Sequence, residues 1–269
     1  MKSKSLLGGA SIGTIGGLIG LGGAEFRLPF LVGILKIDTF HAIMINILIS
    51  LVTVSFALLF RGLDESFYSN FYIVLNLLSG SLIGAYLGAN FASKIDKTRL
   101  NKYIFILLVF LSLVLFSHIF FEYNNSFFPP LYLQISLGFI LGIAIGAISS
   151  LLGVAGGELL IPVIILLYGI DIKTAGTLSL AISLPTLLMG IYKYNKNEKL
   201  KEIFSFKDVI VFMALGSIIG AFIGVLLFGI VEALYIEILL GFILLVSAYK
   251  LFRNSKKFRY RYILNYIMN

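Results

Sequence analysis

The chain contains no cysteine and no tryptophan, only two histidines (His41 and His118), and few charged residues, which make up 13% of its 269 residues. Without cysteine there is no disulfide framework, thiolate metal site or cysteine nucleophile, and two histidines leave little for a histidine-rich metal centre. We therefore expect no metal and no cofactor. The catalytic patterns H-E-x-x-H and G-x-x-x-x-G-K-[ST] are also missing, so we do not expect an enzyme.

Apolar residues take the place of these groups. They make up 59% of the chain, and the mean hydropathy is +1.02, far above the range of soluble domains. Seven to nine apolar stretches of helical length share the chain with short linkers, and about 20 residues are needed to span the hydrocarbon core of a bilayer. We expect an all-α polytopic membrane protein surrounded by lipid.

The net charge of +8 suggests a nucleic-acid partner at first sight. Most of the 21 Lys and Arg residues, however, lie in clusters between apolar runs. Such clusters are orientation signals of membrane proteins, so we do not expect nucleic acid as a partner.

An internal repeat divides the chain into two halves. Shifting residues 9–53 by 133 positions onto 142–186 gives 16 identities in 45. GLGGAEFRLP at residues 20–29 aligns with GVAGGELLIP at 153–162, and GSLIGAYLG at 80–88 matches GSIIGAFIG at 216–224. We predict a first repeat at 1–125, a second at 126–252, and a basic cytoplasmic tail at 253–269.

Each half begins with an interrupted apolar segment and continues with three ordinary spans. The interrupted segments are residues 6–35 and 131–168. The predicted spans are 39–60, 68–91 and 101–121 in the first half, and 174–192, 206–229 and 232–252 in the second. Glycine is unfavourable inside a helix, so the Gly-rich stretches should break each interrupted segment near its middle.

The distribution of Lys and Arg favours a hairpin over a single crossing for each interrupted segment. If both segments are hairpins, 18 basic residues fall on one side of the membrane and two, Arg61 and Lys173, on the other, whereas single crossings give 14 and 6. A re-entrant hairpin plus three spans makes an odd number of crossings, so the second half is an inverted repeat and both termini are cytoplasmic. Residues 131–152 are long enough to span alone, so the first arm of the second hairpin is expected to overshoot or to begin at the interface.

The two Gly-rich breaks predict an anion site near the membrane midplane. Irregular backbone at membrane depth is tolerated only in protein or along a wet cavity. The second arm of each hairpin starts with free N–H groups and a positive dipole end, which attract anions. The residues that we assign to substrate at these breaks are Gly22, Gly23, Ala24, Gly156 and Gly157. For the glycine rows at spacing four, at 9–17, 80–88 and 138–146, we expect close helix packing instead.

Three ionisable residues lie inside the interrupted segments. Glu25 and Glu158 occupy equivalent positions, and they either cap the arm that they begin or carry protons, because an anion beside a carboxylate favours the neutral form of the acid. Arg27 has Leu160 as its counterpart. It either supplies a cation for an oxyanion or pairs with a glutamate, and we favour the pairing.

Each span that follows a hairpin carries a polar stripe at spacing i, i+4, i+7, which places its three residues on one helical face. These donors either replace part of the hydration shell of an oxyanion or form interhelical hydrogen bonds. Asp38 and Asp171, just before the two spans, are predicted N-caps. The stripes consist of Asn46, Ser50 and Thr53 in the first half and Ser179, Ser183 and Thr186 in the second.

The doubled Gly-rich motif, each copy ending in proline and followed by an Asp and a polar span, resembles the sulfite exporter TauE/SafE family, also called the toluene sulfonate uptake permease family. The resemblance covers the chain from about Ser5 to Phe252. It implies a prokaryotic inner-membrane transporter of small anions such as sulfite, thiosulfate, sulfoacetate or other sulfonates. Ala24 and Ala155 interrupt the familiar run of three glycines, and Arg27 adds a charge.

We predict secondary active transport of a small sulfur oxyanion or organosulfonate by alternating access, with proton coupling as an option. The alternatives are a non-transporting scaffold or sensor on the same fold, or an anion channel. The sequence predicts neither the direction of transport nor the oligomeric state.

Overall fold

The computed structural model describes residues 1–91, 97–120, 129–195, 203 and 205–267, and no β-strand occurs among them. The first half contains α1 (Lys2–Ile19), α2 (Ala24–Pro29), the π-helix η1 (Phe30–Ile34), α3 (Thr39–Arg61), α4 (Glu65–Ser69), α5 (Phe71–Phe91) and α6 (Lys97–Phe120). The second half contains α7 (Leu131–Leu152), α8 (Gly157–Tyr168), α9 (Ile172–Asn195), α10 (Lys207–Ile230) and α11 (Ala233–Ile267). The predicted all-α class is confirmed.

Six helices are long and apolar enough to cross a membrane: α3, α5, α7, α9, α10 and α11. Five of them coincide with predicted ordinary spans, and the sixth, α7, is the arm that was expected to be long enough to span alone. The predicted span at 101–121 lies in α6, whose apolar stretch among the described residues is shorter, from Tyr103 to Ser117.

Both Gly-rich segments break the helix where predicted and reverse the chain. In the first hairpin (residues 2–34), Gly23 lies against Ile12 and the Phe30 ring lies against Gly8, so the second arm runs back along α1. In the second hairpin (residues 131–168), Gly156 lies against Ser149, and the hydroxyl of Tyr168 is 3.4 Å from the carbonyl oxygen of Gln134. The orientation of the hairpins relative to a membrane, and hence their inversion, stays a prediction.

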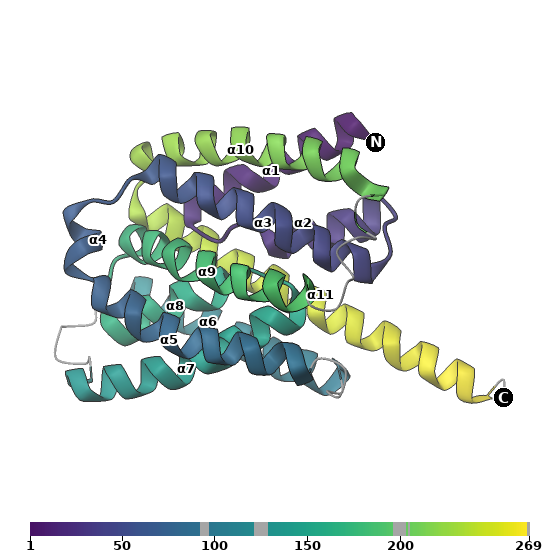
Figure 1. Cartoon of the computed structure of the whole chain (residues 1–269). Helices are drawn as coiled ribbons and strands as arrows, with labels where there is room; N and C mark the ends of the chain where they lie inside the picture. Colours follow the sequence, from purple (N-terminus) through teal and green to yellow (C-terminus); the bar gives the residue numbers. More distant parts are fainter. Residues whose placement is uncertain (92–96, 121–128, 196–202, 204, 268–269) are drawn as a thin grey trace.

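The helices pair in a pattern that is unchanged when the two halves are exchanged. α1 packs on α10 and α7 packs on α5, while α3 and α9 meet between these two pairs and α6 packs on α11. Figure 1 shows α1 and α10 along one edge of the bundle, α5 and α7 along the opposite edge, and α3 and α9 between them. The first arm of each hairpin, α1 or α7, thus packs on a helix of the other half.

The glycine rows pack helices closely, as predicted. A Cβ atom on Gly9, Gly13 or Gly17 of α1 would meet backbone atoms of α10. The rows in α5 and α7 bring those two helices together in the same way, because a Cβ atom on Gly80, Gly84 or Gly88 would meet the backbone of α7, and one on Gly142 or Gly146 would meet the backbone of α5. Only Gly138 of the third row differs, because it lies against the side chains of Tyr168 and Asn76.

The predicted N-caps are also confirmed. The Asp38 carboxylate accepts hydrogen bonds from the backbone N–H groups of Phe40 and His41, and the Asp171 carboxylate accepts them from Lys173 and Thr174. The imidazole of His41 adds a side-chain hydrogen bond to Asp38, which is the main reason that the pKa of this carboxyl lies below its ordinary value.

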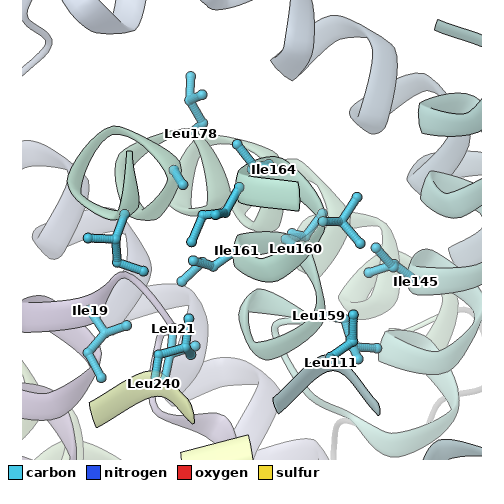
Figure 2. Packing of buried hydrophobic residues seen from close by; sticks show 14 of the residues in the cluster. Ile19, Leu21, Leu111, Ile145, Leu159, Leu160, Ile161, Ile164, Leu178 and Leu240 are labelled. Atoms are coloured by element: carbon cyan, nitrogen blue, oxygen red, sulfur yellow. The ribbon is translucent and has the colours of Figure 1, made fainter. Parts of the chain in front are cut away.

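The largest apolar core forms around α8 and includes the break of the first hairpin. Ile19 and Leu21 belong to the same buried cluster as Ile161 and Leu160 of α8 and Leu240 of α11, and Figure 2 shows Leu21 beside Leu240. All five side chains are almost completely buried. The tip of the first hairpin thus lies inside a core that consists mainly of second-half residues.

Parts of the topology prediction fall outside the described residues. These are the connections at 92–96, 121–128 and 196–202, together with residues 204 and 268–269. The predicted tail continues α11 as a helix to Ile267, and this helix projects from the bundle (Figure 1).

Candidate functional site at the hairpin tips

The two breaks, residues 20–23 (the first tip) and 153–156 (the second tip), lie against each other. A Cβ on Gly157, the residue after the second tip, would meet the backbone of Leu21 and Gly20, and a Cβ on Gly22 would contact the side chain of Ala155. Gly20 and Gly23 have φ values of 100° and 72°, and Gly153 and Gly156 have 67° and 79°. These left-handed conformations suit glycine, so the glycines both shape the turns and permit the close approach.

The second arms begin directly at the tips. α2 starts after Gly23 and α8 starts after Gly156, and no side chain of the described residues caps either N-terminus. All five predicted substrate residues at the breaks are buried, and they lie in the region where the two tips meet: Gly22, Gly23, Ala24, Gly156 and Gly157.

The polar stripes tie the tips to the bundle. Asn46 of α3 donates from Nδ2 to the carbonyl oxygens of Ala24, at 3.1 Å, and Gly153, at 3.0 Å, and so joins both hairpins. On α9, the hydroxyl of Ser179 lies 3.4 Å from the carbonyl oxygen of Gly20, and that of Ser183 donates to Ala155 at 2.8 Å. These hydrogen bonds favour the interhelical role of the stripes in this conformation, because these donors are occupied by tip carbonyls.

Arg27 lies on α2 with none of its surface exposed. Its guanidinium donates to the hydroxyls of Ser50, at 2.8 Å, and Thr53, at 2.9 Å, and to the carbonyl oxygen of Gly22, at 3.2 Å. The predicted ion pair with a glutamate is wrong: Arg27 reaches no carboxylate at ion-pair distance in the part of the chain that the structure describes. The hydroxyls of α3 take that place, and the Nε atom is left without a hydrogen-bond partner.

The repeated glutamates lie at the start of the two second arms. Glu25 is 7% exposed and Glu158 is 6% exposed, and the two carboxyls are close enough to interact electrostatically. Among the described residues, neither carboxylate oxygen of Glu25 accepts a hydrogen bond of good geometry, although the carboxyl interacts with its own backbone N–H group, and Oε2 of Glu158 has no partner there either. Because a capping carboxylate accepts backbone N–H groups and Glu25 has such an interaction, the capping role and the proton-carrying role both stay predictions.

The sequence interpretation missed two residues of α11. The ammonium group of Lys250 donates to the backbone carbonyl oxygen of Glu25 at 2.8 Å and interacts electrostatically with both glutamates. One turn earlier, the hydroxyl of Ser247 interacts with the carboxyl of Glu158. In the sequence, Lys250 lies near the end of the predicted span 232–252, where a lysine is expected to face the cytoplasmic side. Its spacing of three from Ser247 places both residues on one helical face, but this pattern does not indicate what that face contacts.

The described residues thus bring together most of the predicted site. Glu25, Arg27, Asn46, Ser50, Glu158, Ser179 and Ser183 all lie at or beside the two tips. No group of three or more His, Asp or Glu side chains gathers among them.

Comparison with known protein families gives a match over nearly the whole chain. The family model described as sulfite exporter TauE/SafE matches residues 2–121 and 137–266, which is nearly the whole chain. No curated protein and no solved structure matches this chain.

Proposed function

Because this chain belongs to the sulfite exporter TauE/SafE family of membrane transporters, we propose that it is a secondary active transporter of small sulfur oxyanions or organosulfonates, such as sulfite, thiosulfate or sulfoacetate. The observation that carries the proposal is the meeting of the two hairpin tips beside a buried pair of glutamates. In transporters built from repeats, substrate and coupling-ion sites lie where broken helices of both repeats meet.

The tips offer the chemistry that an oxyanion needs. The N-termini of two broken helices supply backbone N–H groups and positive dipole ends, and Arg27 supplies a buried cation. In the conformation described above, Asn46, Ser179 and Ser183 use their donors on tip carbonyls. The substrate competes for these donors when the tips separate.

Proton coupling follows from the glutamates in this proposal. Glu25 and Glu158 are buried close together, and an incoming anion adds a third negative charge. Like charges at short distance favour the neutral acid, so anion binding and proton uptake assist each other. One proton carried with each anion would let the proton gradient drive transport.

Alternating access requires that the contacts around the tips break in turn. Arg61 of α3 is a candidate for one such closure, because it donates to the carbonyl oxygens of Gly17 and Leu18 at the end of α1 and to the hydroxyl of Thr177 on α9. In our proposal the two halves are inverted repeats in a prokaryotic inner membrane and both termini are cytoplasmic. Arg61 and Lys173, the two cations assigned to the outer side, lie together, since Arg61 also approaches the carbonyl oxygen of Lys173 at 3.4 Å.

The decisive experiment is a flux assay in proteoliposomes with labelled sulfite, thiosulfate and acetate, with and without a pH gradient. We expect uptake of the sulfur anions that saturates and follows the gradient, and little uptake of acetate. Glu25→Gln and Glu158→Gln should alter the response to the gradient, whereas Glu65→Gln, which removes an exposed carboxyl on α4, should not. Flux without saturation would favour a channel, and no flux from folded protein would favour a scaffold.

The topology is tested separately, and the natural absence of cysteine makes labelling clean. Single cysteines in place of Lys36 and Lys97 should both react with a membrane-impermeant reagent added from the cytoplasmic side. Reaction from opposite sides would reject the re-entrant hairpin.

A further inference from the structure

Lys250 differs from Arg27 and Arg61 in how many of its N–H donors make hydrogen bonds. An ammonium group has three N–H donors, and the hydrogen bond that the structure gives Lys250 is the one to the Glu25 carbonyl oxygen. In Arg27, both terminal nitrogens donate hydrogen bonds to oxygen atoms of the protein. In Arg61, all three guanidinium nitrogens do so. Lys250 is also partly exposed, whereas Arg27 is not exposed at all.

The surroundings of Lys250 contain charge of both signs. The charged groups that interact with Glu25 are Glu158 of α8, Arg27 of its own helix and Lys250 of α11. With both glutamates ionised, these four groups sum to zero. The Phe26 ring lies 5.7 Å from the Lys250 ammonium and covers one side of it. The Glu25 carboxylate does not reach the ammonium at ion-pair distance among the described contacts, although Lys250 holds the backbone of the same residue.

We propose that the ammonium group of Lys250 is the first contact of the transported anion, and that the adjacent Glu25 carboxyl must be protonated for this contact to form. The inference rests on the proposed transport function and deepens it. Charge-assisted hydrogen bonds from an ammonium group to an oxyanion are among the stronger polar contacts in proteins. An ionised Glu25 beside the same group repels the anion and competes for Lys250, and a neutral Glu25 does neither.

This assignment places the anion contact on a residue that the repeat does not duplicate. α6 is the counterpart of α11 in the first half, and its sequence has no Lys, Arg, Asp or Glu between Tyr103 and Phe120. Lys250 is therefore present once, as Arg27 is, and one anion is expected per chain in each transport cycle.

The test compares Lys250→Gln, Lys250→Arg and the matched control Lys207→Gln, which removes an exposed lysine at the start of α10. Two measurements are made on each protein at several pH values: thiosulfate binding to the purified protein by equilibrium dialysis, and thiosulfate flux in proteoliposomes. We expect Lys250→Gln to raise the Kd and KM for thiosulfate at least tenfold with kcat changed less than threefold. Lys250→Arg should remain within threefold of the wild type, and Lys207→Gln should match it. Glu25→Gln should bind thiosulfate with an affinity that no longer weakens as the pH rises.

The outcomes separate this inference from the transport proposal. Wild-type binding that depends on Lys250, without any flux, supports Lys250 as an anion contact and overturns transport. Flux with a KM that Lys250→Gln leaves within twofold overturns the inference alone. If the wild type neither binds nor transports thiosulfate, both are overturned. Should Lys250→Gln fail to fold, Lys250→Met keeps the aliphatic stem and the same criteria apply. An unchanged pH dependence of binding in Glu25→Gln would reject the role of that carboxyl.

Discussion

The two hairpins share a backbone turn and differ in what fills the space behind it. In the first hairpin, Arg27 lies between Gly22 and the stripe of α3, and it donates to the Gly22 carbonyl oxygen and to Ser50. In the second, the equivalent residue is Leu160 in the apolar core, and Ser183 donates directly to the carbonyl oxygen of Ala155. A serine of the polar stripe is therefore connected to a tip carbonyl oxygen in both halves, through the Arg27 guanidinium in the first half and by a direct hydrogen bond in the second.

The comparison shows which features the repeat requires and which it leaves free. The left-handed glycines at the ends of both tips occur in both halves, because the turn needs them. The cation is not needed for the turn, since the second hairpin forms without one. A buried guanidinium without a carboxylate partner costs desolvation free energy, so we expect Arg27 to be present for function more than for folding.

The largest effect is expected when the second hairpin is given the cation of the first. Leu160→Arg would place a charge among buried apolar side chains, where Thr186, the counterpart of Thr53, already hydrogen-bonds to Ser81. We expect a loss of about 3–5 kcal/mol in the free energy of unfolding. The loss should appear as a lower melting point, measured from size-exclusion profiles after heating in detergent, with Leu160→Met as control. A melting point equal to that of the control would show that both tips accept the cation.

The converse change removes the cation from the first hairpin. Arg27→Leu leaves Ser50 and the Gly22 carbonyl oxygen without this donor, but it also removes the desolvation cost of the guanidinium, so we expect stability to change by no more than about 1 kcal/mol. Thiosulfate flux should fall at least tenfold, as measured in proteoliposomes against wild type at equal protein. Loss of folding together with flux would instead make Arg27 a structural residue.

Two serine substitutions compare the hydrogen bonds that connect each tip to its polar stripe. Ser183→Ala removes one neutral hydrogen bond to Ala155, for which we expect about 1 kcal/mol, whereas Ser50→Ala takes away the acceptor of a buried charge and should cost about 2 kcal/mol. Heat denaturation followed by far-UV circular dichroism gives the order of the two losses. The reverse order would mean that Arg27 finds another acceptor.

Much of the fold followed from sequence pattern. Apolar length predicted the spans, and the aligned glycines predicted the breaks at 20–23 and 153–156, because few residues other than glycine accept those backbone angles. Asp38 and Asp171 were predictable as caps since their interactions are local. The glycine rows were predictable because close packing leaves no room for a side chain.

The environment of the site residues was less predictable, because it depends on contacts between distant segments. Arg27 meets Ser50 and Thr53 across 23 and 26 residues of sequence, and nothing in the repeat indicated that hydroxyls would replace a carboxylate. Lys250 lies 225 residues from Glu25. A lysine at the end of an apolar stretch has the same local pattern whether it faces a headgroup or a buried glutamate, so only the tertiary fold distinguishes the two.

The smallest expected effect tests the ends of the hairpins. Lys36 and Gly169 are equivalent in the repeat, and both have left-handed φ values, 58° and 68°. A residue with a Cβ is strained by about 1–2 kcal/mol there, and glycine loses up to about 1 kcal/mol through its larger unfolded-state freedom. Lys36→Gly should therefore stabilise the protein by about 0.5–1 kcal/mol, and Gly169→Ala should destabilise it by a similar amount, both measured by heat denaturation. Equal shifts of opposite sign would show that the two hairpins end in the same turn, while a loss of stability in Lys36→Gly would show that the lysine side chain contributes contacts that its glycine counterpart lacks.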